Sequence, residues 1–207
     1  MRKKHDIVNE IIKRGVSGYL PYREAINADL FHENTKFTPL KAREYGEYIQ
    51  QIVSTAYYVD RMRLAYKCYY FADKIALSTP TELGISICEV IKKRRSVRRF
   101  NGRPISLQEI SNLLFYSYGI TGEMPIPRHT DYVHRLLAIT SAGSLYPLEI
   151  YIVVFKANNI AQGLYHFNVN NFCLELLKTG EFSNLINEQC FLEPYIAINT
   201  ASCCILI

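Results

Sequence analysis

Residues 141–155 read Ser-Ala-Gly-Ser-Leu-Tyr-Pro-Leu-Glu-Ile-Tyr-Ile-Val-Val-Phe, a turn of small residues followed by an apolar run. The run from Ile150 to Phe155 is rich in β-branched residues, which favours a central strand buried on both faces. The small residues before it indicate a tight turn whose backbone N–H groups can approach a flat ligand. This stretch therefore predicts the core strand of a sheet, with a turn of special geometry at its entrance.

The elements that surround this strand alternate between strands and short helices. Residues 163–167 and 172–177 are expected to be paired strands, joined by an Asn-rich turn at 168–171. Residues 201–207 predict another central strand. Ser106, with Glu109 three residues later, is typical of a capping box, so a helix is expected from there to Gly119. Helices are also expected over 86–93 and 181–190, and a loop over 122–135.

The first 80 residues differ in character from the rest. Apolar residues recur at helical spacing within 1–30, a loop is expected over 31–39, and a helix is expected over 40–77. The Ser-Thr-Pro-Thr segment at 78–81 breaks this pattern. We therefore predict a mainly helical region over 1–80 and a second domain over 81–207.

The composition is that of an ordinary globular protein and excludes disorder, since 49% of the 207 residues are hydrophobic and 21% are charged. No apolar run approaches the ~18–20 residues of a membrane span. The N-terminus lacks the features of a secretory signal, so a cytoplasmic location is the default expectation. The six cysteines form no Cys-x-x-Cys pair and have no His at ligand spacing, which favours small buried hydrophobes and predicts no metal site.

Much of the net charge of +5 comes from residues 92–99, of which six are basic. No nucleic-acid-binding motif accompanies this cluster, so a local anionic ligand explains it better than a nucleic acid. In an extended segment Arg94, Ser96 and Arg98 face the same way. Two guanidiniums that flank a hydroxyl suit a phosphate or the edge of an electron-rich heterocycle. The alternative is a solvated basic face.

Two other motifs also have a structural alternative. The turn from Ser141 to Ser144 is either a place where a flat ligand approaches the backbone or merely a tight turn before a strand. His166 lies among aromatic residues in the segment 163–167. A His in a half-buried strand is more often a hydrogen-bonded structural residue than a catalytic one, and we favour that interpretation.

Four segments, taken in order, resemble the nitroreductase superfamily and, within it, the SagB-type dehydrogenases. They are Arg94–Phe100, Pro104–Glu109, Ser141–Tyr151 and Gly163–Phe167. The resemblance covers residues 85–207 closely and residues 30–84 loosely. It implies a nitroreductase-like α+β fold with a central mixed sheet flanked by helices, and a homodimer with FMN at the subunit interface. It assigns flavin contacts to these six residues: Arg94, Ser96, Arg98, Ser141, Gly143 and Ser144.

The SagB-type resemblance also implies an activity and partners. Such enzymes oxidise thiazoline or oxazoline rings of a ribosomally made precursor peptide to thiazoles or oxazoles, after a cyclodehydratase complex has closed the rings. The C-terminal part of that family, with its Lys-Tyr pair, has no counterpart before Ile207, so we expect a truncated chain that is inactive alone. One alternative is an NAD(P)H-dependent nitro or quinone reductase, although Glu149-Ile150-Tyr151 replaces the Gln-Pro-Trp typical of that branch. Another alternative is a flavin-free scaffold.

Overall fold

The computed structural model describes residues 22–63, 66–126, 129–190 and 196–207. The chain divides into two compact units, Met1–Ile52 and Val53–Ile207. The boundary between the two units lies after Ile52, earlier in the chain than the boundary that the sequence predicts at the Ser-Thr-Pro-Thr segment, 78–81. The helical pattern of residues 1–21 lies outside the described residues. None of the helices in the described part of the chain is long and apolar enough to cross a membrane.

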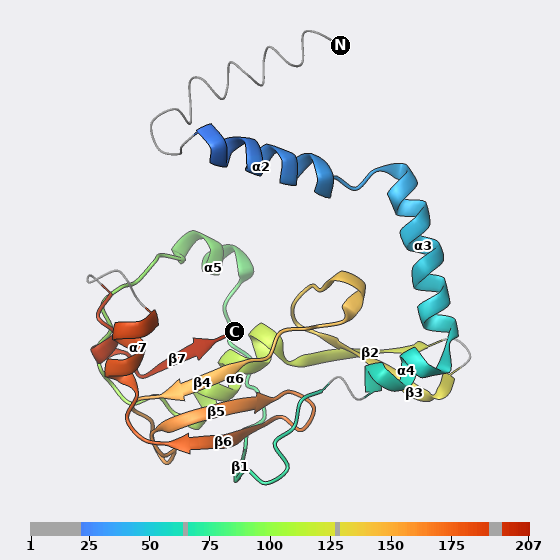
Figure 1. The fold of residues 1–207 in the computed structure, drawn as a ribbon. Coiled ribbons are helices and arrows are strands. Elements are labelled where there is room, and N and C mark those ends of the chain that lie inside the picture. The colour runs from blue at the N-terminus through green and yellow to red at the C-terminus, as the bar shows by residue number, and fades with distance from the viewer. Residues whose placement is uncertain (1–21, 64–65, 127–128, 191–195) are drawn as a thin grey trace. The chain divides into compact units, whose positions relative to one another are not determined.

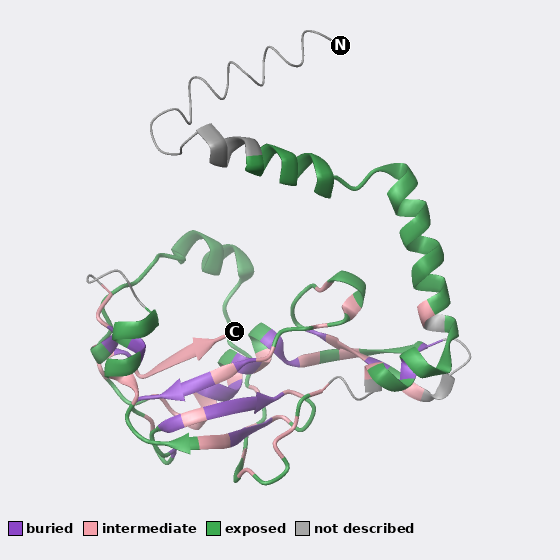
Figure 2. Cartoon of the chain, viewed as in Figure 1, coloured by how far each residue is buried: buried purple, intermediate pink, exposed green. Residues whose placement is uncertain are grey.

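The described residues of the first unit form helices whose described side chains are exposed, except for the half-buried Ile52 (Figure 2). Helix α2 covers Tyr22–Thr35 and helix α3 covers Pro39–Ser54 (Figure 1). The loop expected over 31–39 is therefore shorter than predicted. Thr35 Oγ1 donates a hydrogen bond to Phe31 O at 2.7 Å inside the last turn of α2. Pro39 then begins α3, a position that suits its fixed φ and missing N–H.

The second unit is built on a five-stranded sheet with the order β1-β6-β5-β4-β7 (Figure 1). The strands are β1 Lys74–Ala76, β4 Tyr151–Val154, β5 Gly163–Asn168, β6 Cys173–Thr179 and β7 Cys203–Leu206. The α+β class is confirmed. All four pairings are antiparallel, although a mixed sheet was expected. Among the described residues, the parallel contact is an isolated bridge between Ile105 and Ala157. Strand β7 lies at the edge of the sheet instead of its centre.

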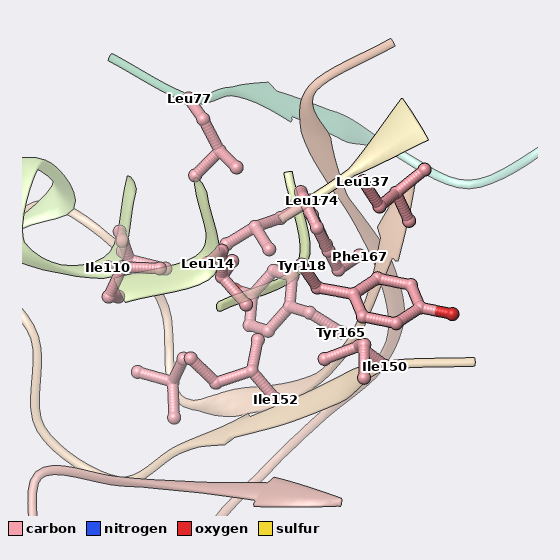
Figure 3. Packing of buried hydrophobic residues seen from close by; sticks show 12 residues of the cluster. Leu77, Ile110, Leu114, Tyr118, Leu137, Ile150, Ile152, Tyr165, Phe167 and Leu174 are labelled. Carbon is pink, nitrogen blue, oxygen red and sulfur yellow. The ribbon is translucent and has the colours of Figure 1, made fainter. Parts of the chain in front are cut away.

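Strand β4 is buried on both faces, as its apolar sequence predicts. Ile152 and Val154 belong to one hydrophobic cluster, whereas Val153 and Phe155 belong to a second. The first cluster includes Ile110 and Leu114 of α6 (Leu107–Tyr118), as Figure 3 shows. The second includes residues of α7 (Ser183–Cys190) and of the short 3-10 helix η2 (Ile198–Thr200). Successive side chains of a strand point to opposite faces of the sheet. Residues of β4 therefore pack against α6 on one face and against α7 and η2 on the other, so helices cover both faces.

Local capping signals in the sequence are confirmed. Ser106 Oγ accepts from the backbone N of Glu109, and Glu109 Oε2 accepts from the backbone N of Ser106, which completes the capping box of α6. The helix ends at Tyr118, directly before Gly119. Helix α5 (Ile87–Lys93) begins after Ser86, whose side chain caps it. These ends are set by contacts within three residues, which explains why the sequence alone predicts them.

Two expectations about longer segments are wrong. The helix expected over 40–77 ends with α4 (Ala56–Arg63), and β1 then pairs with β6. The loop expected over 122–135 is instead a two-stranded ribbon of β2 (Ile120–Ile126) and β3 (His129–Leu137), separate from the main sheet. Pro125 is compatible with this ribbon because each strand has a single partner. For β1 the partner that decides the conformation is distant in sequence, whereas β2 and β3 follow one another in the chain and pair locally.

The six cysteines are free thiols. Cys173 is buried as expected, but Cys88 and Cys190 are exposed. Cys88 belongs to α5, which buries none of its residues. The expectation of buried cysteines is therefore wrong at Cys88 and Cys190, which are exposed on α5 and α7.

Candidate functional site

The turn before β4 is held in an uncommon backbone conformation. Gly143, Ser144 and Tyr146 have φ values of 62°, 53° and 44°, in the left-handed region that disfavours residues other than Gly. Ser141 Oγ accepts a hydrogen bond from Tyr146 N at 2.9 Å, and His134 Nε2 lies 2.8 Å from Ser144 O. One contact within the turn and one from His134 outside it thus hold Ser144 and Tyr146 in a strained backbone conformation. Such strain is common at ligand sites.

A cavity of about 40 Å³ lies beside this turn. The turn contributes Ser144 and Tyr146, and Glu149 follows just before β4. Other walls come from Lys67 and from His134, whose ring stacks on Tyr146 at 20°. The space can accommodate a few groups of the size of a water molecule, but not a flavin ring system. It is therefore suited to a small reacting group at the edge of a larger ligand.

The predicted phosphate segment is exposed and lies outside helices and strands. Arg94 caps the C-terminus of α5, and residues 94–100 are exposed. The backbone of the segment is anchored on the chain before β7, because Ala197 N donates to Arg98 O at 3.0 Å. The adjoining surface is apolar, since Ile87 and Val97 are 74% and 66% exposed. Cations beside an exposed apolar surface fit a ligand such as FMN, which combines a phosphate with a flat ring.

The six predicted flavin contacts fall into two separate groups. Ser141, Gly143 and Ser144 share the turn before β4. Arg94, Ser96 and Arg98 share the exposed segment after α5. The residues that line the cavity include Ser144 but none of the three from the basic segment. Within a single chain, the structure does not bring the two groups to one cavity.

A buried polar cluster on the sheet was missed by the sequence prediction. The register places Tyr151, His166, Glu175 and Lys74 side by side across β4, β5, β6 and β1. His166 Nδ1 lies 2.9 Å from Glu175 Oε2, and His166 Nε2 lies 2.8 Å from Glu149 Oε2. His166 and Glu175 are buried, whereas the side chain of Glu149 is 34% exposed. One imidazole thus connects a buried carboxylate to a carboxylate at the cavity.

Glu175 is ionised although it is fully buried. Burial alone would raise its pKa, but hydrogen bonds outweigh burial and lower the pKa to about 2. The donors are the backbone N of Tyr69 at 2.9 Å, Asn168 Nδ2 at 2.8 Å and His166. Cys68 Sγ also donates to Oε1, the oxygen that accepts from Asn168, at 3.3 Å, and Lys74 Nζ lies 3.6 Å from the same oxygen. A buried carboxylate with this number of partners avoids the large cost of an unpaired charge.

Two tyrosines and a lysine cover the imidazole. The rings of Tyr69 and Tyr151 pack against that of His166 with centroids 5.1 and 5.3 Å away. Lys67 Nζ donates to Tyr151 Oη at 2.6 Å, which raises the pKa of Lys67. The same ammonium lowers the pKa of Tyr69, whereas burial raises that of Tyr151. The cavity lining therefore includes both a cation, Lys67, and the carboxyl group of Glu149.

A signal for this cluster exists in the sequence. His166 and Glu175 lie in two mainly apolar strands that are joined by a short turn. Pairing of the hairpin places the two residues opposite one another. The sequence predicts a hydrogen-bonded structural histidine at position 166, but that prediction does not identify Glu149 and Glu175 as its partners.

Comparisons with known proteins agree with this architecture. No protein-family model matches the chain. Over 126 residues the chain is 34% identical to a Methanocaldococcus jannaschii protein named "Putative nitroreductase", a match that covers 61% of this chain and 59% of that protein. The chain thus spans about three-fifths of the relative's length. A solved structure described as a "putative nitroreductase" from Anabaena variabilis has a TM-score of 0.54 at 24% identity, covering 86% of this chain and 30% of that one. The fold is therefore nitroreductase-like.

Proposed function

We propose that this chain is part of an FMN-dependent oxidoreductase of the nitroreductase type. The observation that carries the proposal is the exposed segment with Arg94, Ser96 and Arg98 beside the uncovered apolar residues of α5. This surface combines the donors that a phosphate needs with the apolar contact that a flavin ring needs. The similarity to a nitroreductase-named relative supports the same cofactor class.

FMN, when bound, supplies two-electron redox chemistry, and the protein binds and tunes it. Arg94 and Arg98 are the residues that would hold the phosphate or the electron-rich edge of the ring. A positive charge near that edge favours the reduced form, which carries more negative charge. The backbone of the turn from Ser141 to Ser144 would approach the ring closely, because its small side chains leave room beside the chain.

A homodimer forms part of the proposal. The basic segment and the turn do not share a cavity within one chain. Ile87, Val90 and Ile91 of α5 are 74%, 51% and 68% exposed, a large apolar area for one short helix. A second copy that covers this area would bury it and would allow one subunit's basic segment to approach the other subunit's turn.

The substrate we favour is a small electron-poor acceptor, a nitroarene or a quinone, reduced at the expense of NAD(P)H. The cavity beside the turn has room for a nitro or carbonyl group, and aromatic side chains such as Tyr146 and Tyr118 line it. The second candidate is oxidation of azoline rings in a precursor peptide delivered by a cyclodehydratase complex. Glu149-Ile150-Tyr151, where the reductase branch typically has Gln-Pro-Trp, favours this second candidate.

Three measurements test the proposal. Purified protein should show flavin absorbance after incubation with FMN, and a colourless protein would instead support a flavin-free scaffold. NAD(P)H consumption that depends on added quinone or nitroarene would support the reductase. Loss of two hydrogens from an azoline peptide, detected by mass spectrometry, without such NAD(P)H consumption would support the second candidate.

A further inference from the structure

We propose that the contact between Glu149 and His166 stores the proton that the site exchanges with a group bound in the cavity, and that Glu175 is the positioning residue for this contact. The inference rests on the proposed oxidoreductase function for its chemistry. Its geometric basis, a buried imidazole between two carboxylates, is independent of any cofactor.

The hydrogen-bond geometry requires a proton between Glu149 and His166. Glu175 accepts hydrogen bonds at both oxygens and is ionised, so His166 Nδ1 must carry a hydrogen and donate it. On the other side of the ring, Nε2 lies 2.8 Å from Glu149 Oε2. An ionised carboxylate and an unprotonated ring nitrogen would present lone pairs to each other there. Therefore one proton lies between them, on the imidazolium or on the carboxyl group.

Glu149 is the member of this trio that a ligand can reach. His166 is 1% exposed and Glu175 is 0% exposed. Glu149 is 34% exposed at its side chain and lines the cavity together with Ser144 and Lys67. A proton can thus pass from His166 Nε2 to Glu149 Oε2 and from Glu149 to the ligand. The imidazole itself is covered, because the rings of Tyr69 and Tyr151 pack on it.

Lys67 completes the chemistry at the same cavity. Its ammonium is held by Tyr151 Oη and lines the cavity wall. A fixed positive charge stabilises negative charge that develops on an acceptor oxygen before that oxygen is protonated. Besides the two carboxylates, the charged or titratable groups around the proton include these residues: Lys67, Cys68, Tyr69, Lys74, Tyr118, His134 and Tyr151.

The step balances for a quinone acceptor. Two electrons and one proton reach the quinone as a hydride equivalent that originates from the nicotinamide. The second proton leaves the Glu149–His166 contact and forms the O–H bond of the hydroquinone. The contact is left with a neutral imidazole and an ionised Glu149. Solvent at the exposed side of Glu149 restores the proton.

The first test examines the protein without cofactor. Nitrogen and carbon chemical shifts of labelled protein at neutral pH should show one shared proton, seen either as a doubly protonated His166 ring or as a protonated Glu149 carboxyl. A neutral His166 together with an ionised Glu149 would overturn the inference. This measurement needs no flavin, so it remains decisive if the proposed function fails.

The second test separates the two half-reactions of the FMN-loaded protein by stopped flow. Reduction of the flavin by NAD(P)H delivers a hydride and should respond weakly to Glu149→Gln. Reoxidation by a quinone needs the stored proton and should slow by about 10²-fold or more relative to reduction. Glu123→Gln, at an exposed position of β2, is the matched control and should leave the ratio of the two rates unchanged.

The outcomes of the second test are distinguishable. A protein whose flavin is never reduced rejects the proposed function, and the chemical shifts then decide the inference alone. A protein whose flavin is reduced normally, and whose Glu149→Gln variant is reoxidised at the wild-type rate, overturns the inference while the proposed function stands.

Discussion

His166 and Glu175 lie directly opposite each other in the register of β5 and β6, and the 2.9 Å contact between Nδ1 and Oε2 is buried. Two titratable residues that are buried on one face of a hairpin destabilise the folded protein unless each is a hydrogen-bond partner of the other. Here the pair is extended by Glu149 to the cavity and by Lys74 to β1. The hairpin therefore supports both the sheet and the candidate site.

Replacement of Glu175 by Ala should strongly destabilise the unit Val53–Ile207. The change leaves the buried His166, Asn168 and the backbone N of Tyr69 without their shared acceptor. Removal of one partner of a buried ion pair costs about 3–5 kcal/mol. Denaturant unfolding followed by tyrosine fluorescence measures this loss. Glu188→Gln, exposed on α7, should change the free energy of unfolding little, and a similar small change in Glu175→Ala would contradict the role assigned to Glu175.

Stability should fall at acidic pH because of Glu175. Its pKa in the folded protein is about 2, below the ordinary value of about 4.3 for Glu. Between these two values the unfolded chain binds a proton that the folded chain does not, so stability is full above about pH 4.3 and is lost as pH falls towards 2. The expected loss is on the order of 2–3 kcal/mol. Unfolding curves at several pH values should be flatter in Glu175→Gln, and an equal slope in both proteins would refute this assignment.

The capping box of α6 should contribute measurable stability. Ser106→Ala removes the acceptor for the backbone N of Glu109 and leaves the first turn of the helix with an unpaired donor. The expected cost is about 1 kcal/mol, seen as a lower denaturation midpoint. Ser106→Thr retains the hydroxyl and should restore most of the stability. If Ala and Thr were equivalent, the cap would have no energetic role.

Gly143 and Gly163 should respond differently to Ala. At Gly143 a Cβ would meet Leu145 Cγ at 3.6 Å, an ordinary contact, so the cost comes from the positive φ and should be roughly 1–2 kcal/mol. At Gly163 a Cβ would lie 2.6 Å from the backbone O of Lys178, which requires β5 and β6 to separate. Gly163→Ala should therefore lower the thermal midpoint more than Gly143→Ala. The reverse order would contradict the hairpin geometry.

Arg98→Ala should weaken FMN binding if the basic segment holds the flavin. Loss of one charge-assisted hydrogen bond costs roughly 1.5–3 kcal/mol, equivalent to about a 10- to 150-fold higher Kd. Flavin fluorescence titration measures the change. Arg95→Ala is the matched control, because the Arg95 guanidinium donates to the backbone O atoms of Lys92 and Arg94 at 3.0 and 2.8 Å. An equal loss in both variants would indicate a general effect of charge and not a specific contact.

Local and short-range features were predictable from the sequence. The apolar run at Ile150–Phe155 forms a central strand, the hairpin of 163–177 forms as expected, and Ser106 with Glu109 starts a helix. Each is specified by residues that are close together in the chain. The segment at Lys74–Ala76 failed as a helix because its partner, β6, follows about 100 residues later. Local propensity contains no information about such a partner.

The sequence by itself determined the central strand, the small-residue turn and the basic segment, because period, capping and turn chemistry act over a few residues. The α+β class followed from the resemblance to a known family. The tertiary structure decided which of these residues meet. It placed Ser144 at a cavity without Arg94, Ser96 or Arg98, and it joined Glu149, His166 and Glu175 from three strands or their ends. The physical reason is that strand register is set by packing and cross-strand pairing, so residues distant in the chain become neighbours only when the sheet forms.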